Sequence, residues 1–222
     1  MKDNIHICSF TTDTLFDKKV YGYIGLDVTF HEKGTRPIFA TADDLVISVC
    51  DFDIPDCERT FLSFLRKFSC KHHHVFCIGT REKLRMTVQK LKSVPSFVQS
   101  YTVVSKDADF SYDEVSGLVL NYITPACCIT SPSSFDTYSC IKGPVIINGY
   151  DNLNEQELRS VMTSLPLDNN DVMVSVIGKS TALLTSTIDK YFPNTRFFIS
   201  EDRTHNFERI IFISPSKKKI KS

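Results

Sequence analysis

The feature that most constrains the fold is a set of short, almost wholly apolar runs that alternate with helical patterns. Residues 45–50 (Leu-Val-Ile-Ser-Val-Cys), 145–147 (Val-Ile-Ile) and 172–177 (Val-Met-Val-Ser-Val-Ile) are runs of this kind. Such runs are typical of parallel strands that are covered on both faces. Because helical patterns follow them, the sequence predicts an α/β protein with a mostly parallel central sheet flanked by helices.

The pattern places most of the expected elements after residue 44. The segments 196–200 and 209–214 are predicted to form a C-terminal antiparallel hairpin that closes the chain. We therefore expect an N-terminal extension or linker at 1–43, a core at 44–217 and a basic tail at 218–222. The other expected strands or extended stretches are 45–50, 74–78, 101–105, 117–123, 144–147 and 171–177, and the expected helices are 57–68, 82–91, 154–165 and 180–191.

Size and composition are those of a single intracellular domain. The chain has 222 residues, of which 42% are hydrophobic and 23% charged, as is ordinary for a globular protein. No apolar run approaches the roughly 20 residues that span a bilayer, and residues 1–5 do not resemble a signal peptide. The eight cysteines lack a disulfide rhythm, so we expect reduced thiols.

Residues 53–60 (Asp-Ile-Pro-Asp-Cys-Glu-Arg-Thr) have the length and position of a phosphate-binding P-loop but little of its chemistry. Such a loop reads G-x-x-x-x-G-K-[ST] between a buried strand and a helix. Here Asp53 and Glu58 stand at the glycine positions, Arg59 at the lysine and Thr60 at the hydroxyl. Glycine lets the backbone approach phosphates, whereas two carboxylates repel them. We expect a degenerate loop that holds no nucleotide cofactor.

Three later segments likewise lack residues that a nucleotide-binding site would use. The run 76–81 (Phe-Cys-Ile-Gly-Thr-Arg) resembles the second strand of RecA-like recombinases, with Thr80 kept and Gly79 and Arg81 in place of the two carboxylates. Asn148 stands where a Walker B strand ends in aspartate, which would weaken magnesium binding. Gly178-Lys179 stands where the sensor strand ends in Asn or Gln.

The closing segments complete a family resemblance. Residues 194–199 (Asn-Thr-Arg-Phe-Phe-Ile) and the Ser-Pro ending of 209–217 resemble the last hairpin of eukaryotic recombinase paralogues. The chain is thus similar, over roughly 44–217, to a RecA-like recombinase paralogue that has lost ATPase activity, as in the short subunits of Shu-type complexes. The resemblance implies a RecA-like core.

That resemblance also implies a function. We expect a non-catalytic pseudo-ATPase in homologous recombination and DNA repair, nuclear, which binds a recombinase or paralogue and stabilises or remodels its filament on single-stranded DNA. Phe39 and Ala42 have the Phe-x-x-Ala spacing that recombinases use at protomer contacts, with a core phenylalanine as the alternative. A basic cluster is the expected nucleic-acid contact, with a solvated tail as the alternative; it comprises Lys217, Lys218, Lys219 and Lys221.

A second function is considered on three residues. Asp151, Lys179 and Glu208 occur in the order of the Asp-Lys-Glu set of Rossmann-type RNA 2′-O-methyltransferases, in which the lysine would act as a base on the ribose hydroxyl. Against this interpretation, residues 46–60 lack the glycines that let a backbone approach a methyl donor.

The run 70–77 (Cys-Lys-His-His-His-Val-Phe-Cys) offers five zinc-type ligands in eight residues. Zinc takes about four ligands in tetrahedral geometry. Because neighbouring side chains in a strand point to opposite faces, these ligands do not converge readily. A structural role is therefore favoured over a metal site.

Overall fold

The computed structural model describes residues 5–12, 28–31, 44–66, 70–92, 100–107, 109–128, 135–136, 138, 141–165, 172–179, 181–201 and 208–216. The chain divides into two compact units, one comprising residues 1–120 and 130–144, the other 121–129 and 145–222. Within the described residues, no helix is long and apolar enough to cross a membrane.

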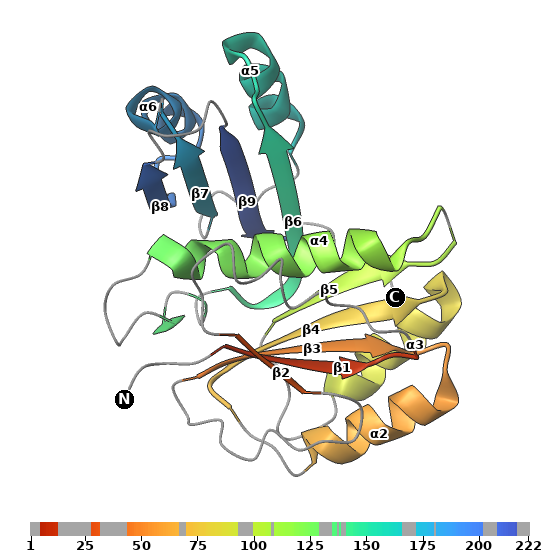
Figure 1. The fold of residues 1–222 in the computed structure, drawn as a ribbon. Coiled ribbons are helices and arrows are strands. Elements are labelled where there is room, and N and C mark those ends of the chain that lie inside the picture. The colour runs from red at the N-terminus through yellow and green to blue at the C-terminus, as the bar shows by residue number, and fades with distance from the viewer. Residues whose placement is uncertain are drawn as a thin grey trace. The chain divides into compact units, whose positions relative to one another are not determined.

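The first unit contains a parallel sheet whose five strands are ordered β2-β1-β3-β4-β5, and β5 also pairs at Ser100 and Tyr101 with the first two residues of β6. Figure 1 shows α2 and α3 on one face of this sheet and the first part of α4 along the other. Its elements are β1 (Ile5–Phe10), β2 (Val28–His31), β3 (Leu45–Asp51), α2 (Pro55–Leu65), β4 (His72–Gly79), α3 (Arg81–Lys92), β5 (Ser100–Ser105) and the start of α4 (Tyr112–Ile123).

Strands β3 and β4 are buried inside the first unit. Every residue of β3 and of β4 is buried, as expected for parallel strands covered on both faces. On one face, Phe61 and Leu65 of α2 and Leu84 and Val88 of α3 pack in one apolar cluster. Their spacing of about one helical turn gives each helix its buried stripe.

The second unit has a mixed sheet ordered β6-β9-β7-β8, in which β9 is antiparallel to both β6 and β7 while β7 and β8 are parallel. The helices α5 and α6 pack in one apolar cluster with β7 and β9. Asn154 begins α5 with a capping box shared with Glu157, which satisfies N–H groups at the helix start. Its elements are η1 (Thr124–Cys128), β6 (Gly143–Asp151), α5 (Glu155–Ser164), β7 (Met173–Gly178), α6 (Thr181–Tyr191), β8 (Arg196–Glu201) and β9 (Arg209–Pro215).

The predicted α/β class with a mostly parallel sheet and a few antiparallel strands is confirmed, but three finer predictions differ from the structure. The segment 117–123 is the end of helix α4, whose buried residues Val115, Val119 and Tyr122 follow helical spacing. The closing hairpin is absent among the described strands, because β9 lies between β6 and β7 and β8 pairs with β7. The region 1–43 is not merely an extension, since β1 is a buried strand paired with β3.

Candidate functional site

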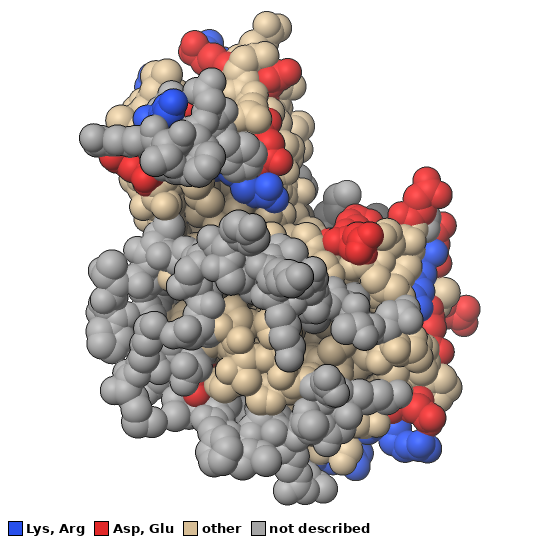
Figure 2. Space-filling model, in the orientation of Figure 1, with Lys and Arg blue, Asp and Glu red and all other residues tan. Residues whose placement is uncertain are grey.

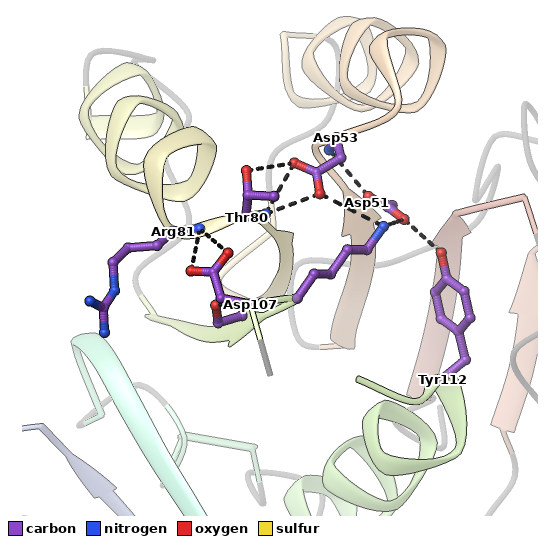
Figure 3. A network of polar contacts seen from close by, with 8 residues as sticks. Asp51, Asp53, Thr80, Arg81, Asp107 and Tyr112 are labelled. Atoms are coloured by element: carbon purple, nitrogen blue, oxygen red, sulfur yellow. Dashed lines mark hydrogen bonds and ion pairs between the residues drawn. The ribbon is translucent and has the colours of Figure 1, made fainter. Parts of the chain in front are cut away.

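The candidate site lies in the first unit, where β3, β4 and β5 end. The strand order runs outward from β1 to β2 on one side and from β3 to β5 on the other. In parallel α/β sheets, ligands bind beyond the carboxyl ends of the strands near such a reversal of strand order. Figure 3 shows that the polar residues following these strands contact one another.

Asp51, the last residue of β3, is fully buried and is held by two donors from elsewhere in the unit. The ammonium of Lys106 lies 2.5 Å from its Oδ2, and the hydroxyl of Tyr112 donates to the same oxygen at 2.6 Å. The Lys106 ammonium also lies 5.4 Å from the centre of the Phe110 ring. A buried carboxylate needs this pairing, because removal of either donor leaves charge in a weakly polar environment.

Asp53 reaches from the loop after β3 to the end of β4. The backbone N–H of Thr80 donates to both of its carboxylate oxygens at 3.1 and 3.0 Å, and the Thr80 hydroxyl donates to Oδ1 at 3.1 Å. The Lys106 ammonium lies 3.9 Å from Oδ2. Next along the chain, the N–H of Arg81 donates to Asp107 at 3.1 and 3.3 Å. Two carboxylates thus occupy the positive N-terminal end of α3 (Figure 3).

Backbone donors in the loop after β3 are used within the protein. The N–H of Phe52 donates to the carbonyl of Ile78, that of Asp53 to Asp51 Oδ1, and that of Ile54 to the carbonyl of Asp51. The next residue, Pro55, has no N–H. In the first turn of α2, the N–H groups of residues 57 and 58 both donate to the carbonyl of residue 54.

The other three residues of the predicted P-loop make local or inter-helix contacts. Arg59 pairs with Asp56 at 2.7 Å, and the Thr60 hydroxyl donates to the carbonyl of Asp56 at 2.7 Å. Glu58 accepts from Lys83 at 2.8 Å and is 3.4 Å from the ammonium of Lys90. Burial alone would raise the pKa of Glu58, but the hydrogen bonds and charges of these lysines outweigh it and leave the pKa below its ordinary value. The prediction that this loop holds no nucleotide remains a prediction.

Of the predicted positions, Thr80 contacts Asp53 of the loop and Arg81 follows it as the first residue of α3, whereas Asn148 and Gly178 lie in the second unit. Asn148 lies within β6, which continues to Asp151, and Gly178 ends β7. Asp151 is held by the Arg209 guanidinium at 3.1 and 3.2 Å. Glu208 is the neighbour of Arg209, and its N–H donates to Asn152 Oδ1 at 2.9 Å.

Several partner predictions lie outside the described residues. These are Phe39, Ala42, Lys217, Lys218, Lys219 and Lys221. On the described part of the face drawn in Figure 2, basic and acidic side chains are interspersed and no broad basic surface is present.

Two histidines of β4, His73 and His74, form hydrogen bonds with side chains of the neighbouring strands β3 and β5. His73 Nε2 lies 2.8 Å from Ser48 Oγ, and the two ring nitrogens of His74 lie 2.8 and 3.1 Å from Ser100 Oγ and Thr102 Oγ1. Burial lowers the pKa of His73 to about 3 and holds the pKa of His74 well below its ordinary value. Burial likewise raises the pKa of the Cys77 thiol. The described residues contain no group of three ligands that could hold a metal ion.

Four residues of the site are not among those predicted from the sequence. Asp51 ends β3, and Lys106 and Asp107 are the first two residues after β5, so a search for polar residues after every strand would have found them. Tyr112 has no such signal, because it begins α4 after a turn.

Comparison with known proteins identifies the fold. No protein-family model and no curated protein sequence matches the chain. Among solved structures, CetZ from Methanosaeta thermophila strain DSM 6194 is 8% identical over 97% of this chain and 87% of its own, with a TM-score of 0.68. TubZ from Clostridium botulinum phage c-st is 10% identical over 98% and 94%, with a TM-score of 0.56. CetZ2 from Haloferax volcanii, solved as a GTPγS-bound protofilament, is 10% identical over 81% and 67%, with a TM-score of 0.54.

These findings overturn the functional expectations. Neither a RecA-like recombinase paralogue nor a methyltransferase is supported, because the structural relatives are tubulin/FtsZ-like GTPases. Recombination, DNA repair and a recombinase partner are therefore wrong, as is the expectation of a non-enzymatic pseudo-ATPase. The same alternation of strand, turn and helix produced the motif order that resembled RecA. The chain has an α/β fold of the Rossmann-like tubulin/FtsZ kind.

Proposed function

We propose that this protein is a cytoskeletal-type assembly protein that associates with copies of itself into filaments. The observation that carries the proposal is the fold, which matches CetZ with a TM-score of 0.68 over 97% of the chain. A structure of the same fold, CetZ2, was solved as a protofilament. A repeated contact between two different surfaces of identical subunits produces such open chains when its rotation does not close a ring.

Apolar side chains on the surface of the second unit support self-association. Leu183 on α6 is 63% exposed, Ile199 on β8 is 47% exposed, and Tyr191 ends α6 at 36%. Among the described strands, β8 is the outermost of its sheet. Exposed apolar side chains on an outer strand and the helix beside it are typical of surfaces that contact other chains.

The test is assembly of the purified full chain, followed by sedimentation velocity and negative-stain electron microscopy over a range of protein concentrations. One series contains GTP and a parallel series contains no nucleotide. The proposal requires concentration-dependent oligomers or filaments in at least one series. A chain that stays monomeric in both series would contradict it.

A surface substitution makes the test specific. Leu183→Asp places a charge on the exposed face of α6 and is expected to raise the protein concentration at which oligomers form by about tenfold or more. Ser160→Asp introduces the same charge at an exposed position of α5 and is the matched control. Equal assembly by both variants would place the contact away from α6.

A further inference from the structure

The start of α3 holds an anion position whose role is independent of the proposed assembly. Relatives of this fold include one bound to GTPγS, so the fold implies a guanine nucleotide whose phosphates must be held by donors of the protein. We propose that the carboxylate of Asp53 is an internal substitute for a phosphate group. It occupies the donors at the end of β4 and prevents them from binding nucleotide phosphates.

The donors around Asp53 are those that a phosphate would use. Its carboxylate accepts from the N–H and the hydroxyl of Thr80 and lies 3.9 Å from the ammonium of Lys106. Backbone N–H groups near a helix start, a hydroxyl and a lysine form a common binding set for phosphate oxygens. In this protein the anion that satisfies them is part of the chain.

The backbone next to Asp53 is shaped for this close approach. A Cβ atom added at Gly79 would lie 3.1 Å from Asp53 Oδ1 and 3.5 Å from its Cγ, closer than ordinary van der Waals contact for the oxygen. The absence of a side chain at position 79 therefore lets the carboxylate lie against the end of β4. The position of the carboxylate thus depends on Gly79 at the end of β4 as well as on Asp53 in the loop.

The backbone N–H groups next to Asp53 are not available to a phosphate. The N–H groups of Phe52, Asp53 and Ile54 already donate to oxygens of the protein, and Pro55 has none. In glycine-rich phosphate loops, by contrast, successive N–H groups point at the ligand. Residues 52–55 therefore offer a bound phosphate no backbone N–H group that is not already used.

The charges around the start of α3 also oppose phosphate binding. Lys106 is committed to the buried carboxylate of Asp51 at 2.5 Å, and Asp107 occupies the N–H of Arg81. A phosphate at the start of α3 would meet the carboxylates of Asp53 and Asp107 and, behind them, that of Asp51. Lys106 is the counter-charge of Asp51 and Asp53. Like charges at this range oppose binding.

The experiment removes the internal anion and measures the binding of inorganic phosphate and of GTP. Asp53→Ala leaves the Thr80 donors and Lys106 in place, so phosphate affinity, measured by calorimetry, is expected to rise by about tenfold or more over the unchanged protein. Asp53→Asn, which keeps the size and removes the charge, should rise in the same direction. Asp56→Ala removes an exposed carboxylate of the same segment and should bind phosphate no better than the unchanged protein.

Two further measurements test whether phosphate binds at Thr80. Adding Thr80→Ala to Asp53→Ala should reduce the gained affinity, and the amide resonance of Thr80 should shift on phosphate addition in Asp53→Ala but not in the unchanged protein. The proposal is overturned if the unchanged protein binds phosphate or GTP with a shift at Thr80. It is also overturned if both Asp53 variants keep their circular dichroism spectra and gain no affinity.

Discussion

Acidification should destabilise this protein through the buried histidines of β4, and His73 allows the effect to be calculated. Its ring is buried, with Nε2 at 2.8 Å from Ser48 Oγ and the Phe64 ring edge-on to it at a centroid distance of 6.1 Å. Burial lowers its pKa to about 3 in the folded chain, whereas a histidine in an unfolded chain has a pKa of about 6.5. The folded state therefore binds fewer protons than the unfolded state between these values.

The direction in which the free energy of unfolding changes with pH follows from this difference in bound protons. Above a pH of about 6.5 both states hold a neutral ring and His73 imposes no penalty on folding; as the pH falls toward 3, the unfolded state gains protons and is favoured. Between about pH 7 and about pH 5 the loss of unfolding free energy from His73 alone is about 2 kcal/mol. His74, whose pKa is also lowered by burial, adds to the loss in the same direction.

The assay is urea unfolding at the two pH values, followed by far-ultraviolet circular dichroism because the chain contains no tryptophan. The quantity of interest is the change in unfolding free energy between pH 7 and pH 5, measured for the unchanged protein and for His73→Gln. Any cost of the substitution that does not depend on pH cancels in this comparison. The variant should lose about 2 kcal/mol less on acidification. If both proteins lose the same amount, the reasoning about His73 is refuted.

Two further predictions concern the second unit: the close packing at Gly149 and the N-terminal cap of α5. Gly149→Ala should destabilise by about 1–3 kcal/mol, because its Cβ would lie 2.7 Å from Asn121 Nδ2 and 3.3 Å from Arg209 Nη2 and would disturb the 2.8 Å bond between those side chains. The control is Gly117→Ala, inside α4 with no atom within 4 Å of the added Cβ, which should stabilise the protein by about 0.5–1 kcal/mol. Thermal unfolding of both variants measures the two changes. If both variants change the melting temperature in the same direction, the prediction is contradicted. Asn154→Ala removes the cap of α5 and should cost about 1 kcal/mol, whereas an unchanged melting temperature would show that the cap contributes no stability.

Secondary structure is predicted most accurately where the apolar residues of a segment are also the residues that the element buries. The apolar run at 45–50 and the helical stripe with Phe61 and Leu65 led to β3 and α2 within a few residues, because each buried face repeats with the period of its element. The prediction of an extended stretch at 117–123 is wrong for the opposite reason. Its residues Gly-Leu-Val-Leu-Asn-Tyr-Ile also suit a strand, and only packing at Val115 and Val119 shows the helix.

Strand order and the site could not be predicted in the same way. That β9 enters between β6 and β7 depends on pairings across tens of residues, such as Asn148 with Phe212. Similarly, the loop with Asp53 was found from its spacing, but its contacts with Thr80 and Lys106 join three strand ends far apart in the sequence. The RecA resemblance failed because motif order along the chain does not determine which strands become neighbours.

The position of β9 has a consequence for how the second unit folds. This strand is made after β6, α5, β7, α6 and β8, yet it supplies the only described link between β6 and the β7–β8 pair. Until residues 209–215 have been synthesised, β6 and β7 each present an edge with unpaired backbone groups, and such edges readily pair with other chains. The second unit thus completes its sheet only after its last strand has been made, and during synthesis it depends on protection of two open edges.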